Sequence, residues 1–150
     1  MANLGDLTIR PAREEDLEGI LAILTEAGLV TDGVREHLGT FLVAREGDRM
    51  VGCGGSEAYQ YAALIRSIAV APEYRSIGLG RRLVREMLDR LAARGLREFY
   101  ILTIDAEPWF KKRGFKAIDR DEIHPQLLAS AELQGACPDT AVCMRLVMPR

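Results

Sequence analysis

The sequence predicts a single mixed α/β (α+β) domain, with a mostly antiparallel sheet of about seven strands and helices on both faces. Short apolar runs alternate with stretches in which apolar residues recur every three or four positions. The chain has 150 residues, 48% of them hydrophobic, which is one domain's worth of core. The sequence contains no linker, repeat or low-complexity tract, so we assign residues 1–150 to one domain.

The expected elements follow from apolar spacing and from turn residues. The expected strands cover residues 7–10, 41–45, 50–54 with an extension toward 59, 64–70, 99–104, 115–118 and 141–147. The expected helices cover residues 17–27, 34–38, 83–92, 105–114 and 125–133. Asp105 is the expected N-cap of the fourth helix, and Gly28, Gly95 and Gly114 are expected to end helices.

Charge and composition limit the class of function. Lys and Arg number 20 and Asp and Glu 22, which gives a net charge of -2. Nucleic-acid-binding domains are usually strongly basic, so we expect no nucleic-acid partner. No apolar run approaches the ~20 residues of a membrane span, so we expect no membrane partner. Three cysteines without framework spacing predict a cytoplasmic location, and two distant histidines offer little for a metal, so we expect none.

The most informative stretch joins an apolar strand to a long amphipathic helix. The strand ends with Ile68-Ala69-Val70, and the loop reads Arg75-Ser76-Ile77-Gly78-Leu79-Gly80-Arg81. The first N–H groups of a helix lack intrahelical partners, and the helix dipole adds partial positive charge. The two glycines let an anion approach the backbone, and nearby arginines, including Arg82, add charge that binds phosphate oxygens. The stretch therefore predicts a diphosphate-binding site.

Two common diphosphate motifs do not fit this stretch. The Gly-Lys-Ser/Thr of a P-loop is absent. A dinucleotide-binding fingerprint needs a third glycine where Leu83 stands, and an acidic residue at the end of a strand, whereas Glu98 precedes its strand.

Three ordered segments resemble one family. Arg75-x-x-Gly78-x-Gly80, after an apolar strand and before a helix, resembles the acetyl-CoA motif of the GCN5-related N-acetyltransferases, the GNAT family. Residues 109–115, Trp-Phe-Lys-Lys-Arg-Gly-Phe, resemble the family's later helix-to-strand element, and Arg10-Pro11-Ala12 matches its usual opening. The resemblance implies the GNAT fold, acetyl-CoA as co-substrate, and direct attack of an amine in a ternary complex. Many relatives pair as dimers, so a homodimer is one expectation.

Within the family, residues 36–44, 63–70 and 137–144 resemble the arsenic-resistance N-acetyltransferases, relatives of N-acetylglutamate synthase domains. This resemblance implies a small-molecule amine acceptor that is amino-acid-like or an arsenical. Two alternatives stay open: an enzyme like N-acetylglutamate synthase, and a non-catalytic sensor that binds acyl-CoA.

The resemblance also assigns roles to residues. It implies that the backbone from Ile68 to Val70 pairs with the pantetheine arm, and that an amide there stabilises the oxyanion. It implies that amides from Ile77 to Arg81 hold the pyrophosphate. Phe110 is expected to border the thioester.

The sequence departs from the family at both customary proton-transfer positions. Phe110 stands where many members have Tyr, and Leu64 stands where histone-type members have Glu. We therefore expect Glu57 to bind the amine or act as a water-mediated base, and Arg66 to hold a carboxylate or arsenical oxyanion. The structural alternative is an ion pair between Glu57 and Arg66 on neighbouring strands.

The three cysteines allow one sharper alternative. Cys53, Cys137 and Cys143 could converge as soft thiolate ligands for trivalent arsenic. The ordinary interpretation is that each is a small buried apolar residue.

Overall fold

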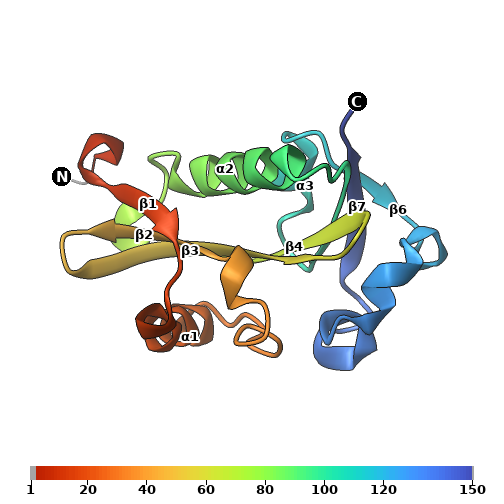
Figure 1. The fold of residues 1–150 in the computed structure, drawn as a ribbon, viewed down its shortest axis with the longest axis horizontal. Coiled ribbons are helices and arrows are strands. Elements are labelled where there is room, and N and C mark those ends of the chain that lie inside the picture. Colours follow the sequence, from red (N-terminus) through yellow and green to blue (C-terminus); the bar gives the residue numbers. More distant parts are fainter. Residues whose placement is uncertain (1–2, 150) are drawn as a thin grey trace.

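A seven-stranded sheet separates helices on its two sides in the computed structural model, which describes residues 3–149 (Figure 1). The strands are β1 (Thr8–Pro11), β2 (Leu42–Glu46), β3 (Arg49–Ala58), β4 (Ala62–Val70), β5 (Glu98–Thr103), β6 (Lys116–Ile118) and β7 (Val142–Val147). Their order is β1-β2-β3-β4-β5-β7-β6, and among the pairs that residues 3–149 form, only β4–β5 is parallel. The predicted fold class is confirmed.

The helices cover opposite faces of the sheet. Helix α1 (Leu17–Glu26) lies on one face, and α2 (Leu79–Ala93) and α3 (Glu107–Lys111) lie on the other (Figure 1). Two glycines of β3 let α2 pack closely on the sheet. A Cβ atom on Gly54 would lie 2.9 Å from Met87 Cε, and one on Gly52 would lie 3.2 Å from Leu79 Cδ2. This close packing fixes the start of α2 beside the end of β4.

Three local expectations were wrong. Residues 34–38 form turns rather than a helix, and a 3₁₀ helix, Leu38–Thr40, follows them. So short a segment gains few helical hydrogen bonds for the backbone entropy it loses. Ala106 rather than Asp105 occupies the N-cap of α3, and its N–H donates to Thr103 Oγ1 at 3.0 Å.

The segment 125–133 is also not one helix. It divides into a 3₁₀ helix, Pro125–Ala129, and a π turn, Glu132–Ala136, within which Gly135 has φ 114°. The expected helix ends are confirmed, since Gly28, Gly95 and Gly114 each follow a helix with positive φ.

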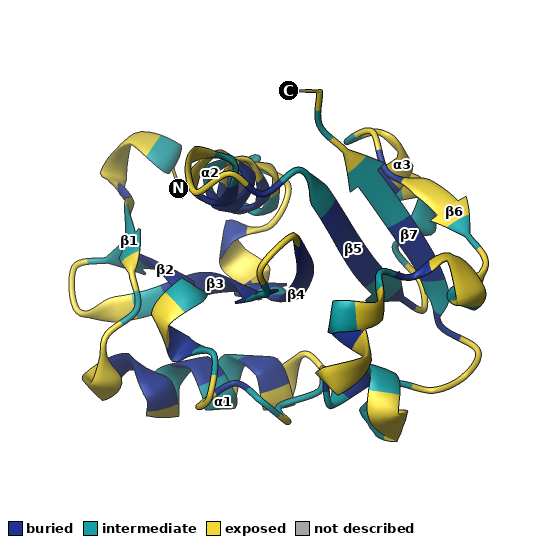
Figure 2. Ribbon diagram, turned by 45° about the vertical axis from the view of Figure 1, so that its right-hand side comes forward, coloured by how far each residue is buried: buried dark blue, intermediate teal, exposed yellow. Residues whose placement is uncertain are grey.

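The only parallel strand pair of the described sheet opens into a V. Strands β4 and β5 pair from Ala62↔Glu98 to Leu64↔Tyr100, and no later pairing joins them within residues 3–149. Beyond that point β4 bulges: Ser67 has φ 59°, and the β3–β4 register shifts between Cys53 and Gly55. A bulge bends its strand, so β4 turns away from β5 (Figure 2). Both strands therefore present unpaired backbone edges at the opening.

Between residues 3 and 149, every helix is too short or too polar to cross a membrane.

Candidate functional site

The first of two clefts lies where β4 ends and α2 begins. We call it the loop cleft, and its volume is about 660 Å³. Its lining residues are Ile68, Val70, Tyr74, Arg75, Ser76, Ile77, Gly78, Leu79, Gly80, Arg81, Ala106, Trp109, Phe110 and Arg113. Every residue predicted for the coenzyme is in this set except Ala69, whose side chain packs in the core beside α1. The expected role of Ala69 concerned its backbone.

The loop before α2 leaves its amides open to the cleft. Gly78, with φ 89°, occupies the N-cap of α2 and offers no side chain to the first-turn N–H groups. Arg75 Nε donates to the Val70 carbonyl oxygen at 3.0 Å, which ties the loop to the end of β4. Arg81 lines the cleft, whereas Arg82 lines a different surface depression. Open amides beside guanidinium groups are complementary in charge to an anion.

Helix α3 closes the other side of the loop cleft with aromatic rings. Phe110 is buried and meets Trp109 edge-to-face, with ring centroids 4.9 Å apart. The Arg113 guanidinium lies 4.1 Å from the centroid of the Trp109 ring. No individual site role was assigned to Trp109 or Arg113 from the sequence. Both residues lie within the segment 109–115 that contains Phe110, so their place in that segment could have predicted that they line the cleft.

The second cleft lies on the α1 side of the β4–β5 opening. We call it the splay cleft, and its volume is about 300 Å³. The loop after α1, residues 27–30, forms one wall. Residues 101–106, which follow the point where β5 separates from β4, form another. Its polar lining includes Arg66, Ser67 and Glu132. Ile68, Ala106 and Phe110 line both clefts, so the clefts meet at the opening between the strands.

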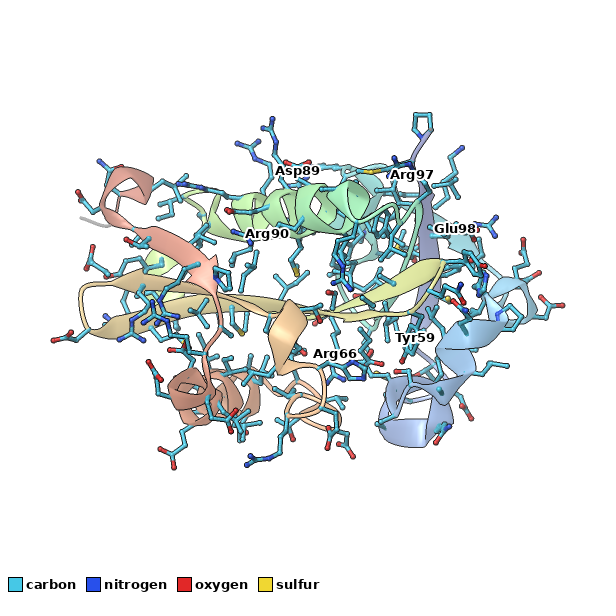
Figure 3. The ribbon with its side chains drawn as sticks, viewed as in Figure 1. Tyr59, Arg66, Asp89, Arg90, Arg97 and Glu98 are labelled. Atoms are coloured by element: carbon cyan, nitrogen blue, oxygen red, sulfur yellow. The ribbon has the colours of Figure 1, made fainter. Side chains whose placement is uncertain are left out.

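Glu57 and Arg66 form a buried ion pair on the α1 side of the sheet. Arg66 Nη1 donates to Glu57 Oε2 at 2.6 Å, and Tyr59 OH donates to Glu57 Oε1 at 2.6 Å. Figure 3 shows Arg66 and Tyr59 on the α1 side of the sheet. Burial raises the pKa of Glu57, but hydrogen bonds from Tyr59, Arg66 and Ser130 outweigh it and leave the pKa below its ordinary value. Both oxygens are occupied and the pKa is low, so Glu57 is a weak proton acceptor. The ion pair considered as the structural alternative is formed.

Arg66 faces a second carboxylate that sequence reasoning missed. Its Nε lies 3.4 Å from Glu132 Oε2, and the Arg66 side chain is fully buried. Burial raises the pKa of Glu132; Arg66 opposes this rise, and the nearby charge of Glu57 adds to it. No motif marks Glu132, because only tertiary folding brings its π turn against β4. One guanidinium therefore separates a carboxylate of low pKa from one of raised pKa.

The three cysteines do not converge. Cys53 lies in the core beside α1, Cys143 lies in a separate apolar cluster, and Cys137 lines the splay cleft. Within residues 3–149, the one group of acidic, His or Cys side chains close enough to share a metal is Asp119, Asp121 and Glu122, all exposed. A three-thiolate arsenic site is therefore not formed.

Comparison with known proteins identifies the family. The model of the acetyltransferase (GNAT) domain matches residues 37–117, more than half of the chain. The chain belongs to the GNAT family of N-acetyltransferases. It is 30% identical to an N-acetyltransferase, CT2212, of Chlorobaculum tepidum, over 95% of each protein. It is 28% identical to the amino-acid acetyltransferase of Aeromonas salmonicida over 76% of this chain, which corresponds to only 28% of that relative.

Solved structures share this GNAT fold. The N-acetylglutamate synthase of Neisseria gonorrhoeae, complexed with coenzyme A and N-acetyl-glutamate, has a TM-score of 0.81 at 22% identity, over 96% of this chain and 35% of that one. Rv2747 of Mycobacterium tuberculosis, complexed with CoA and NLQ, has a TM-score of 0.77 at 21% identity, over 95% and 99% of the two chains. At these identities the similarity establishes the fold alone.

Proposed function

We propose that this GNAT chain transfers the acetyl group of acetyl-CoA to the amine of a small amino-acid-like acceptor. One observation carries the proposal: the loop cleft, with its open amides and arginines, and the splay cleft, with its buried charged groups, meet at the β4–β5 opening. A ternary complex needs this arrangement, because the two substrates must approach from opposite sides and meet at the thioester.

The loop cleft suits the coenzyme. First-turn amides of α2, with Arg75 and Arg81 beside them, match the charge of a diphosphate. The unpaired edge of β4 from Ile68 to Val70 suits an extended arm with amide groups, in the manner of strand addition. The arm would then lead the thioester toward Phe110, where the two clefts meet.

The splay cleft suits a small zwitterionic acceptor. Its buried charged groups are of opposite sign, Arg66 and Glu132, and an exposed carboxylate, Asp105, also lines it. Val30, Ile101 and Phe110 are among its apolar lining residues. A guanidinium is complementary to the acceptor carboxylate, and Glu57 holds that guanidinium in place. The relatives named amino-acid acetyltransferase support this acceptor class. An arsenical oxyanion is the alternative ligand for the same guanidinium.

Most of the rate enhancement in this scheme comes from positioning. Holding amine and thioester in line gives effective molarities up to ~10⁵–10⁸ M in favourable cases. A backbone amide near the Ser67 bulge would stabilise the oxyanion that forms during attack. Phe110 has no proton to give, so the CoA thiolate leaves without a side-chain acid at that position.

Two measurements test the proposal. Acetyl-CoA at 100 times its Kd should stabilise the protein by about 2.7 kcal/mol, seen as a rise in Tm. Free-thiol release should then be followed with glutamate, the other standard amino acids and an amino-arsenical. Turnover only with the arsenical would change the acceptor class. A Tm shift without any turnover would favour a non-catalytic sensor, and no shift would contradict the coenzyme assignment.

A further inference from the structure

We propose that Glu132 is the catalytic base that takes a proton from the acceptor amine in the splay cleft. The inference rests on the proposed function and names a residue that no family motif contains. It has two grounds. The Glu132 carboxylate lies in a cleft that is continuous with the proposed thioester site, and the nearby Arg66 guanidinium does not fully balance the charge of this carboxylate.

Position is the first part of the argument. Glu132 lines the splay cleft together with Ile68, Ala106 and Phe110, the three residues shared with the loop cleft. An amine bound beside Glu132 therefore lies in the cavity that reaches the β4–β5 opening. Glu57 is not among the lining residues of either cleft.

Charge balance is the second part. One guanidinium, that of Arg66, faces two carboxylates. Glu57 accepts a hydrogen bond from this guanidinium at 2.6 Å and another from the Tyr59 hydroxyl, so Glu57 is the main ion-pair partner of Arg66. Glu132 stands farther away, at 3.4 Å, and is left with hydrogen-bonding capacity for an incoming ammonium group. When environments separate the proton affinities of two neighbouring carboxylates in this way, they also separate their chemical roles.

Three other titratable groups lie in or near the splay cleft. Asp105 also lines it, but Asp105 is exposed, whereas Glu132 is buried beside Arg66. The thiol of Cys137 interacts with Glu132, and burial together with the Glu132 charge raises the pKa of that thiol to about 12, so it stays neutral. On the far side of Glu57, His37 Nε2 lies 3.6 Å from Glu57 Oε1. Burial also raises the pKa of the Glu132 carboxyl, which brings its proton affinity closer to that of a base working near neutral pH.

The proton balance of the step is complete without a further reactant. The acceptor arrives as an ammonium ion and gives one proton to the Glu132 carboxylate. The freed lone pair attacks the thioester carbonyl carbon, the C–N bond forms, and the C–S bond breaks to release the CoA thiolate. The nitrogen loses its second excess proton to that thiolate, giving the amide and free CoA thiol. Glu132 then releases its proton to water.

The test compares Glu132→Gln and Glu132→Asp with wild type, using the standard amino acid or amino-arsenical that gives the fastest thiol release. We expect Glu132→Gln to lower kcat at least ~100-fold while the Tm shift by acetyl-CoA stays unchanged. The acidic limb of the pH profile of kcat/KM should move toward the pKa of the amine itself. Glu132→Asp should recover part of the rate, which a merely structural role does not predict.

A second measurement does not depend on turnover. In ¹³C-carboxyl NMR, with assignments taken from the Gln variants, Glu132 should titrate above the ordinary glutamate value and Glu57 below it. A Glu132→Gln variant with wild-type kcat and an unmoved acidic limb overturns the role of Glu132 and leaves the proposed function standing. No acetyl-CoA binding by wild type contradicts the proposed function itself. Binding without turnover overturns both the reaction and the role of Glu132 in it.

Discussion

The loop cleft and the splay cleft meet at one opening but are built in different ways. The loop cleft comes mostly from a continuous stretch, residues 68–81, with α3 closing one side. The splay cleft takes residues from the end of α1, from β4, from β5 and from the segment after residue 131. The loop cleft uses backbone amides, which many residue types can present if the backbone adopts the right φ and ψ. The splay cleft uses individual side chains whose meeting depends on the whole fold.

The two clefts should therefore respond differently to amino-acid substitution. A cleft made of backbone should fail when its space is filled, and a cleft made of paired charges should fail when one partner is removed. Four experiments test this distinction, and they are given in order of decreasing expected effect.

Removing the central cation of the splay cleft should cost the most. Arg66→Met leaves Glu57 and Glu132 buried without their guanidinium. Loss of one partner of a buried pair costs about 3–5 kcal/mol, to be measured by urea unfolding at neutral pH. The double variant Arg66→Met with Glu57→Gln should be more stable than Arg66→Met alone. A loss for Arg66→Met below ~1 kcal/mol would mean that this ion pair does not hold the sheet face together.

Filling the loop cleft should abolish coenzyme binding with little effect on folding. A Cβ atom at Gly80 would lie 3.6 Å from Trp109 Cζ2, so Gly80→Ala fits and serves as the control. Gly80→Glu adds a carboxylate beside the first-turn amides, and we expect acetyl-CoA affinity to fall at least ~100-fold, or about 2.7 kcal/mol. Calorimetric titration measures both variants. Equal affinity for the Glu and Ala variants would remove the diphosphate from this loop.

Single arginines beside the loop should have smaller effects. Arg81 lines the cleft, whereas Arg85, one helical turn later, lies outside it, and both are exposed. We expect Arg81→Met to raise the Kd for acetyl-CoA about tenfold, less so at high salt, because exposed charges are screened. Arg85→Met should leave the Kd within about twofold. Equal effects of the two variants would point to a general field rather than a contact.

The smallest effect is an opposite pH dependence of stability at the two carboxylates. The lowered pKa of Glu57 contributes stability above the ordinary glutamate value, and this contribution is lost as pH falls through the folded pKa. The raised pKa of Glu132 contributes stability below that value, and this contribution is lost as pH rises through the folded pKa. The stability lost in Glu57→Gln should therefore grow as the pH rises toward the ordinary glutamate pKa, and that lost in Glu132→Gln should shrink as the pH rises above it. Parallel curves from urea unfolding would show that the two groups share one environment.

Local sequence predicted most of the fold and the loop cleft. Strand runs, the amphipathic stripe of α2 and terminal glycines act over a few residues, and so do the glycines and arginines of residues 75–81. The failures were also local. Residues 34–38 are too few to form a stable helix, and Ala106, whose N–H donates to Thr103 Oγ1, takes the N-cap position expected for Asp105. Short segments are decided by packing and by competing hydrogen bonds more than by propensity.

The mixed sheet between helix layers and the glycine- and arginine-rich start of α2 follow from the amino-acid sequence alone, because periodicity and a glycine-rich helix start are short-range properties. Tertiary folding was needed to show that β4 bulges at Ser67 and diverges from β5, that Glu57 and Glu132 share Arg66, and that Cys53, Cys137 and Cys143 stay apart. The proton affinity of a side chain depends on burial and on charges brought from distant segments. Spacing along the chain does not contain that information.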